Sequence, residues 1–294
     1  MTNYVFNGIN NGMSTGNFVA GGPNPDFLYI TYPRGFDTLN IRTDNQGNTI
    51  VESALGGTFI MKGVTLDQLS DANFGQVDGD VDIGTNGPDW LSGSIVVGKA
   101  GNDIIWGQSA GSDDFLAGNQ GNDDIDGNGG MDRIRGGLGD DEIYGFGRGS
   151  IVYGDKHADT ITAGNFVNEE DDHTGVTIFG GSGDPNDPLD GGDDITGSAY
   201  DDVIQGNGGA DEIRGGEGDD VIRGGKDDDD LYGNNGKDWL RGDKGDDLIF
   251  GDRQGDELTG GEGKDIFGFN WQSGGSNQSQ IGDVSIENID EDGL

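Results

Sequence analysis

A large apolar residue recurs every nine positions between residues 197 and 268, and the residues between are mostly glycine, acidic or polar. The stretch divides without a gap into eight nine-residue units, each opening with glycine. The apolar residue stands at position eight of every unit, as Ile204, Ile213, Ile222, Leu231, Leu240, Ile249, Leu258 and Phe267. Because side chains alternate between the two faces of a strand, positions seven to nine predict a short strand with position eight inward and its neighbours outward.

The first six positions of each unit predict a tight turn, since glycine takes positive φ without steric cost. Two units then make one flattened coil of a parallel β-roll, in which units i and i+2 stack on the same edge about 4.8 Å apart. The alternative is an acidic, glycine-rich disordered linker. The apolar position never leaves its register in the eight units, which favours the all-β roll.

Position six is aspartate in all eight units. Stacked turns would point backbone carbonyls and two of these carboxylates into one gap, and hard oxygen ligands in that number suit calcium better than zinc or copper. Without a cation, carboxylates at this spacing would repel strongly. Including less regular units from residue 84 onward, the candidate calcium ligands are Asp89, Asp103, Asp114, Asp123, Asp132, Asp141, Asp159, Asp193, Asp202, Asp211, Asp220, Asp229, Asp238, Asp247, Asp256 and Asp265. With two per interior site, they predict roughly ten to fifteen ions.

One unit, residues 145–153, departs from this pattern. Ser150 replaces the aspartate at position six, and Arg148 replaces glycine at position four. A serine hydroxyl carries no charge, so we expect a missing or weak calcium site there.

The pattern predicts three regions. Residues 1–76 form a β-rich capping module, in which strands are expected at 27–30, 38–42, 48–52 and 58–62 between turn signals. Residues 77–268 form the roll, with an insertion at 163–196, and residues 269–294 form a C-terminal cap or tail. Asp78, Asp80 and Asp82 match the first half of an EF-hand loop, but Ile83 stands where that loop requires glycine. A strand entering the roll is the better interpretation.

The unit GGEGDDVIR at residues 215–223 fits the consensus GGxGxDxUx, where U is apolar. The chain resembles the RTX (repeats-in-toxin) family over most of its length. This resemblance implies a parallel β-roll that binds multiple Ca²⁺ ions and leaves a Gram-negative cell by type I secretion. GVTLDQLSDANF at residues 63–74 also resembles the β-rich flanking module of RTX proteins. In the family that module often follows the repeats, whereas here it precedes them.

Composition narrows the partners further. The formal net charge of −40 argues against nucleic acid and anionic membranes. Because the sequence contains no cysteine, disulfides and thiolate metal sites are excluded. Bound calcium is then the available means of stabilising the fold of an exported chain. The first ten residues lack the pattern of a Sec signal peptide, and no run is apolar enough for a membrane span.

The sequence gives little support for catalysis. His157 stands at a turn position of a repeat, and His173 lies in the acidic segment 169–173, where a solvated loop is favoured over a metal site. HExxH is absent, and residues 12–16 match G-x-S-x-G without the strand-to-helix elbow that this motif requires. We therefore expect a protein that is not an enzyme.

Two functions remain open. The first is a secreted, calcium-folded structural, surface or extracellular-matrix protein; the second is a targeting or secretion module of a larger RTX toxin, adhesin or hydrolase. The terminal segments 26–74 and 281–294 resemble complementary parts of one flanking module, so homo-oligomers or filaments joined end to end are expected. The alternatives are that each end caps its own roll, or that the tail is a secretion signal. Val203, Val221 and Trp239 share an outward column, which either contacts a cell surface or polysaccharide or only stabilises the strands.

Overall fold

The structure is a computed structural model of the whole chain. It describes residues 81–108, 111–164, 174–181, 188–252, 255–268 and 285–287, together with the backbone of six strands in residues 1–61. Every regular element in these ranges is a β-strand. None of the described segments forms a helix that is long and apolar enough to cross a membrane.

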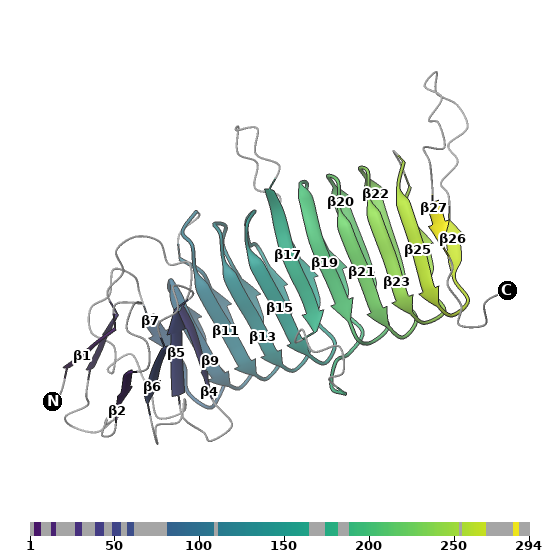
Figure 1. Cartoon of the computed structure of the whole chain (residues 1–294). Helices are drawn as coiled ribbons and strands as arrows, with labels where there is room; N and C mark the ends of the chain where they lie inside the picture. Colours follow the sequence, from purple (N-terminus) through teal and green to yellow (C-terminus); the bar gives the residue numbers. More distant parts are fainter. Residues whose placement is uncertain are drawn as a thin grey trace.

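Two parallel sheets face each other and form the roll (Figure 1). The 10-stranded sheet contains β8 (Trp90–Ser92), β10 (Ile104–Trp106), β12 (Asp124–Asp126), β14 (Glu142–Tyr144), β16 (Thr160–Thr162), β18 (Asp194–Thr196), β20 (Glu212–Glu217), β22 (Asp230–Asn235), β24 (Leu248–Phe250) and β26 (Ile266–Gly268). The 11-stranded sheet contains β7 (Val81–Ile83), β9 (Ile95–Ala100), β11 (Phe115–Gln120), β13 (Arg133–Leu138), β15 (Ile151–Lys156), β17 (Thr174–Gly181), β19 (Asp201–Asn207), β21 (Val221–Lys226), β23 (Trp239–Lys244), β25 (Glu257–Glu262) and β27 (Ser285–Glu287). The chain alternates between the two sheets, so each coil contributes one strand to each.

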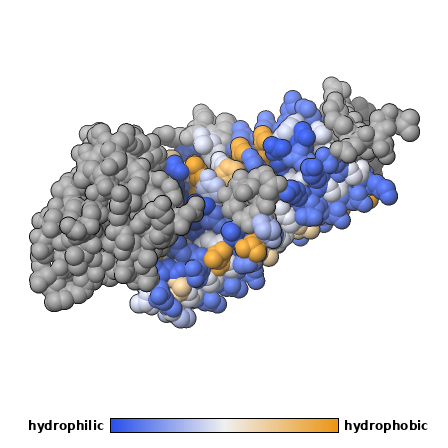
Figure 2. All heavy atoms as spheres, turned by 60° about the horizontal axis from the view of Figure 1, so that its bottom comes forward, coloured by the Kyte–Doolittle hydropathy of each residue, from blue (hydrophilic) through white to orange (hydrophobic). Residues whose placement is uncertain are grey.

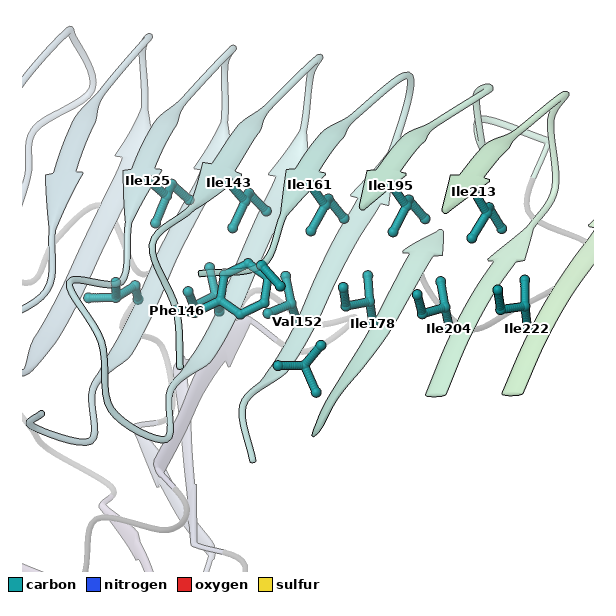
Figure 3. Close-up of a cluster of buried hydrophobic side chains, with 14 of the residues drawn as sticks. Ile125, Ile143, Phe146, Val152, Ile161, Ile178, Ile195, Ile204, Ile213 and Ile222 are labelled. Carbon is teal, nitrogen blue, oxygen red and sulfur yellow. The ribbon is translucent and has the colours of Figure 1, made fainter. Parts of the chain in front are cut away.

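Strand register confirms two nonapeptides per coil. Ile204 pairs with Ile222, and Ile222 pairs with Leu240, each eighteen residues further along the chain. The side chains of Ile204, Ile222 and Leu240 are fully buried. Together with the position-eight side chains of the other sheet they form two facing rows between the sheets (Figure 3). The apolar core is therefore a narrow double column that extends one step per coil.

Positions seven and nine of the eight units in residues 197–268 face outward, as expected, whereas the flanking residues Ile95, Val97, Phe115 and Ala117 of β9 and β11 are buried. Val203 and Val221 are each 38% exposed, and Trp239 pairs with Val221 in the same column. One face of the roll is mostly hydrophilic, with hydrophobic residues in scattered groups (Figure 2). Contact of the Val203–Val221–Trp239 column with a cell surface or polysaccharide stays a prediction.

Two strands of the roll lie within the expected insertion at 163–196. β17 and β18 lie inside it and continue both sheets in register, with Ile178 paired to Ile204 and Ile195 paired to Ile213. These isoleucines supply the buried position-eight side chains, so each coil closes despite irregular turns. Segments 165–173 and 182–187, including His173 and the acidic cluster, lie outside the described residues.

The N-terminal region contains two further sheets. β4 (Leu39–Thr43), β5 (Thr49–Ser53) and β6 (Thr58–Met61) are antiparallel, and β2 (Met13–Thr15) pairs parallel with β6. β1 (Asn3–Phe6) pairs with β3 (Phe27–Ile30). The four expected strands therefore form within a residue or so of their predicted bounds, while capping of the roll by this module stays a prediction. β7 pairs with β9, which confirms a strand entering the roll.

Candidate metal-binding turns

The position-six aspartates stack on the two edges of the roll and are bonded to each other. In each pair, the backbone N–H of one aspartate donates to Oδ1 of the aspartate in the next coil, as from Asp211 to Asp229 at 2.9 Å. We call one edge the continuous edge; its turns carry Asp89, Asp103, Asp123, Asp141, Asp159, Asp193, Asp211, Asp229, Asp247 and Asp265. We call the other edge the interrupted edge; its turns carry Asp114, Asp132, Asp202, Asp220, Asp238 and Asp256. The sixteen predicted residues thus fall into two rows.

Nine such Asp–Asp bonds join the continuous edge without a gap. Four join the interrupted edge, one before and three after a break. The bond from Asp159 to Asp193 spans 34 residues because the coil between them contains more residues than a regular coil. The stacking of the aspartates therefore continues along the continuous edge even where the length of the turns varies.

The second carboxylate oxygen, Oδ2, has no protein partner at most of these aspartates. It is buried without a hydrogen bond at Asp103, Asp123, Asp132, Asp141, Asp159, Asp193, Asp211, Asp220, Asp229, Asp238, Asp247 and Asp265. Each of these oxygens lies over the glycine that opens its own turn: a Cβ at Gly118 would sit 2.1 Å from Oδ2 of Asp123. Glycine is needed there because the carboxylate folds back onto the backbone.

Burial raises the pKa of these carboxyls. Desolvation raises the pKa of Asp211 to about 10, and that of Asp220 to about 9, above the usual 3.8. Neighbouring carboxylates in the same row raise both pKa values further, while a backbone N–H opposes the change. An ionised carboxylate in this position requires a cation to offset its desolvation.

The donor set fits calcium. Twelve of the sixteen turns offer a carboxylate oxygen that lacks a protein partner, in glycine-rich backbone whose carbonyls are hard oxygen ligands. The described residues contain no group of three or more His, Cys, Asp or Glu that could hold a metal ion by side chains alone. The oxygen donors of these turns, carboxylates and backbone carbonyls, suit calcium better than zinc.

Three predicted aspartates are satisfied by the protein itself, and sequence reasoning missed their partners. Oδ2 of Asp89 accepts from the N–H and Oγ1 of Thr85, and Asp114 accepts from the hydroxyl of Ser112. Asp202 accepts from the N–H and hydroxyl of Ser198. The available signal was a hydroxyl residue two or four positions before the aspartate.

The other candidate groups take structural roles where they are described. His157 has φ 74°, as its turn position predicted, and its backbone N–H donates to Leu189 O. Residues 13–15 of the G-x-S-x-G match form strand β2, which is not the strand-to-helix turn of that motif.

Comparison with known families agrees with this geometry. The model of the RTX calcium-binding nonapeptide repeat (4 copies) matches residues 83–125, 109–143, 189–222, 206–240 and 232–267. A search of curated proteins found no matching relative. The repeat pattern, the parallel roll and the family match lead to one conclusion: residues 83–143 and 189–267 of this chain are RTX calcium-binding nonapeptide repeats.

Proposed function

We propose that this chain is a secreted structural or surface protein that folds when it meets calcium outside the cell. The observation that carries the proposal is the row of buried, unpartnered Oδ2 atoms along both edges. Extracellular calcium modules bind at about 10⁻⁴–10⁻³ M, far above cytosolic calcium. The chain would thus stay unfolded and competent for export inside the cell, and would fold into a rigid roll outside it. RTX repeats are typical of secreted proteins.

The charge of the chain supports the same function. A formal net charge of −40 opposes compaction, because buried and surface carboxylates repel one another. If each of the thirteen Asp–Asp pairs holds one ion, calcium neutralises a large part of this charge. A rod with a hydrophilic surface and a calcium-dependent core suits a coat or matrix component.

End-to-end self-association is the finer part of the proposal. β27 pairs with β25 of its own roll, through Leu258 and Ile286, so the tail extends its own 11-stranded sheet. Tail exchange into a neighbouring molecule therefore has to compete with this pairing. β26 ends the 10-stranded sheet and carries Ile266, which is 63% exposed. An exposed apolar side chain on an edge strand favours strand addition by a second copy.

Deleting residues 281–294 and substituting Ile266→Lys separate these contributions. We expect light scattering in millimolar calcium to show assemblies of the full chain that are lost in Ile266→Lys, while both chains keep the same β spectrum. If assemblies need the tail instead, strand exchange through residues 281–294 is the contact. A full chain that stays monomeric at saturating calcium would refute self-association and leave calcium-coupled folding intact.

A further inference from the structure

Two consecutive turns on the interrupted edge lack a position-six carboxylate. Ser150 stands at this position in turn 145–150, and Val176, in β17, stands at it one coil further along the edge. The N–H of Val176 donates to Oδ1 of Asp202 at 2.7 Å, which is the bond made by position-six residues elsewhere on the edge. The register of the edge thus continues, but two carboxylates in sequence are missing.

Apolar side chains fill this part of the edge. Phe146 is fully buried, Val176 is 2% exposed and Ala163 is 6% exposed, and all three belong to the cluster of the position-eight residues. Figure 3 shows Phe146 among the buried side chains of this cluster. A Cβ at Gly127 would meet Cα and Cβ of Phe146 at 3.0 Å, so the preceding turn packs directly on Phe146.

The backbone of turn 145–150 is rebuilt to admit Phe146. In the regular turn 136–141, positive φ occurs at Gly137 and Gly139, which are positions two and four. In turn 145–150 it occurs at Gly145 and Gly149, positions one and five. Position two, which is Phe146, therefore does not need the left-handed conformation that large side chains rarely adopt, and phenylalanine fits there.

The remaining polar group is satisfied without a metal. Oγ of Ser150 accepts the N–H of Asp132 at 2.8 Å and donates to Gly130 O at 3.2 Å. At the described residues of these two turns, no buried side-chain oxygen lacks a partner, in contrast to Oδ2 of Asp132 in the preceding turn.

The row of aspartates restarts after this gap in the way that rows begin elsewhere. Asp89 opens the continuous edge and Asp114 opens the interrupted edge, and each is bonded by a hydroxyl of its own turn. Asp202, the first aspartate after the gap, is bonded by the Ser198 hydroxyl in the same manner. The structure therefore treats Asp202 as the start of a new row.

We propose that Phe146, Ala163 and Val176 form an apolar joint that stands in place of the position-six carboxylates of two consecutive coils and divides the interrupted edge into two independent calcium arrays. One array lies at Asp114 and Asp132, and the other runs from Asp202 to Asp256. The proposal rests on the proposed calcium-dependent folding. The continuous edge passes the joint without a break, so the two halves of the roll stay connected by calcium on one side only.

Calcium stoichiometry tests the joint directly, with radioactive ⁴⁵Ca²⁺ in equilibrium dialysis. Ser150→Ala and Asp220→Ala remove the polar atoms of the same turn position, on the joint and in a regular array. We expect Ser150→Ala to bind as many ions as the natural chain and Asp220→Ala to lose at least one. Loss of an ion in Ser150→Ala would overturn the joint, whereas a natural chain that binds no calcium would overturn the proposed function instead.

Coupling across the joint is a second and independent measurement. Asp132→Ala and Asp220→Ala lie on opposite sides of the joint, so their fold-changes in calcium midpoint should multiply in the double variant. The matched pair Asp220→Ala and Asp238→Ala lies in one array, where the double variant should shift the midpoint by less than the product. If both pairs deviate from the product equally, the two arrays are not independent and the proposal fails.

Discussion

The backbone N–H of Asp220 donates a 2.9 Å hydrogen bond to Oδ1 of Asp238, one coil further along the same edge. Both residues also carry a buried Oδ2 atom without a protein partner. The two carboxylates are thus linked through the backbone, and we predict that they share a cation.

Asp220→Ala and Asp238→Ala should each weaken calcium binding at the same place. We expect the double variant to be sub-additive, with a coupling free energy of about 0.5–3 kcal/mol, because the second substitution removes a ligand from a site already damaged. Calcium midpoints from circular dichroism give the cycle. The control pair, Asp238→Ala with Asp103→Ala on the other edge near the opposite end of the roll, should be additive; full additivity in both pairs would contradict shared sites.

The inward and outward strand positions should differ sharply in their effect on stability. Ile222→Ala empties part of the buried column and should lower the free energy of unfolding in calcium by about 2–5 kcal/mol. Its neighbour Val221 is 38% exposed, and Val221→Thr keeps β-branching, so a change within about 0.5 kcal/mol is expected. Urea unfolding at saturating calcium measures both, and equal losses would show that the burial pattern is wrong.

The turns should reject side chains where backbones of successive coils meet. Gly218 has φ 113°, and a Cβ there would lie 2.4 Å from the carbonyl carbon of Tyr200. Gly218→Ala should therefore cost more than the roughly 1–2 kcal/mol of a left-handed non-glycine residue. Gly87→Ala is the control, since a Cβ there would come no closer than 4.0 Å to Thr85 Oγ1. Similar thermal stability of the two variants in calcium would argue against this close approach.

Much of this structure was predictable because it follows from periodicity. Ile204 and Ile222 were placed inward, and Asp220 beside Asp238, since a nine-residue repeat with two units per coil fixes both. Phe146 and Ser198 were not predicted to have these roles, because each depends on the conformation of one turn and not on the repeat.

Acidification should have opposite effects on the metal-free and the calcium-loaded roll. Burial raises the pKa of the row carboxyls from 3.8 to values between about 6 at Asp103 and about 10 at Asp211. The metal-free roll therefore binds more protons than the unfolded chain; this contribution to its stability is fully present below about pH 4 and is lost as pH rises through about 6 to 10. With calcium the ionised form is bound, so acidification should release ions.

The measurement of this pH effect is β content against pH in calcium-free buffer and in millimolar calcium. High salt in both series screens repulsion between surface charges, which is a separate effect of acidification. We expect β content to rise toward low pH without calcium and the calcium midpoint to increase toward low pH. A metal-free β signal that grows with pH would contradict the raised pKa values.

The central claim is that calcium completes the fold, and far-UV circular dichroism with and without the ion tests it most directly. The chain should be largely unfolded in excess chelator at neutral pH, and should become β-rich as calcium reaches the millimolar range, reversibly on renewed chelation. A spectrum that is equally β-rich in excess chelator and in calcium would contradict the account.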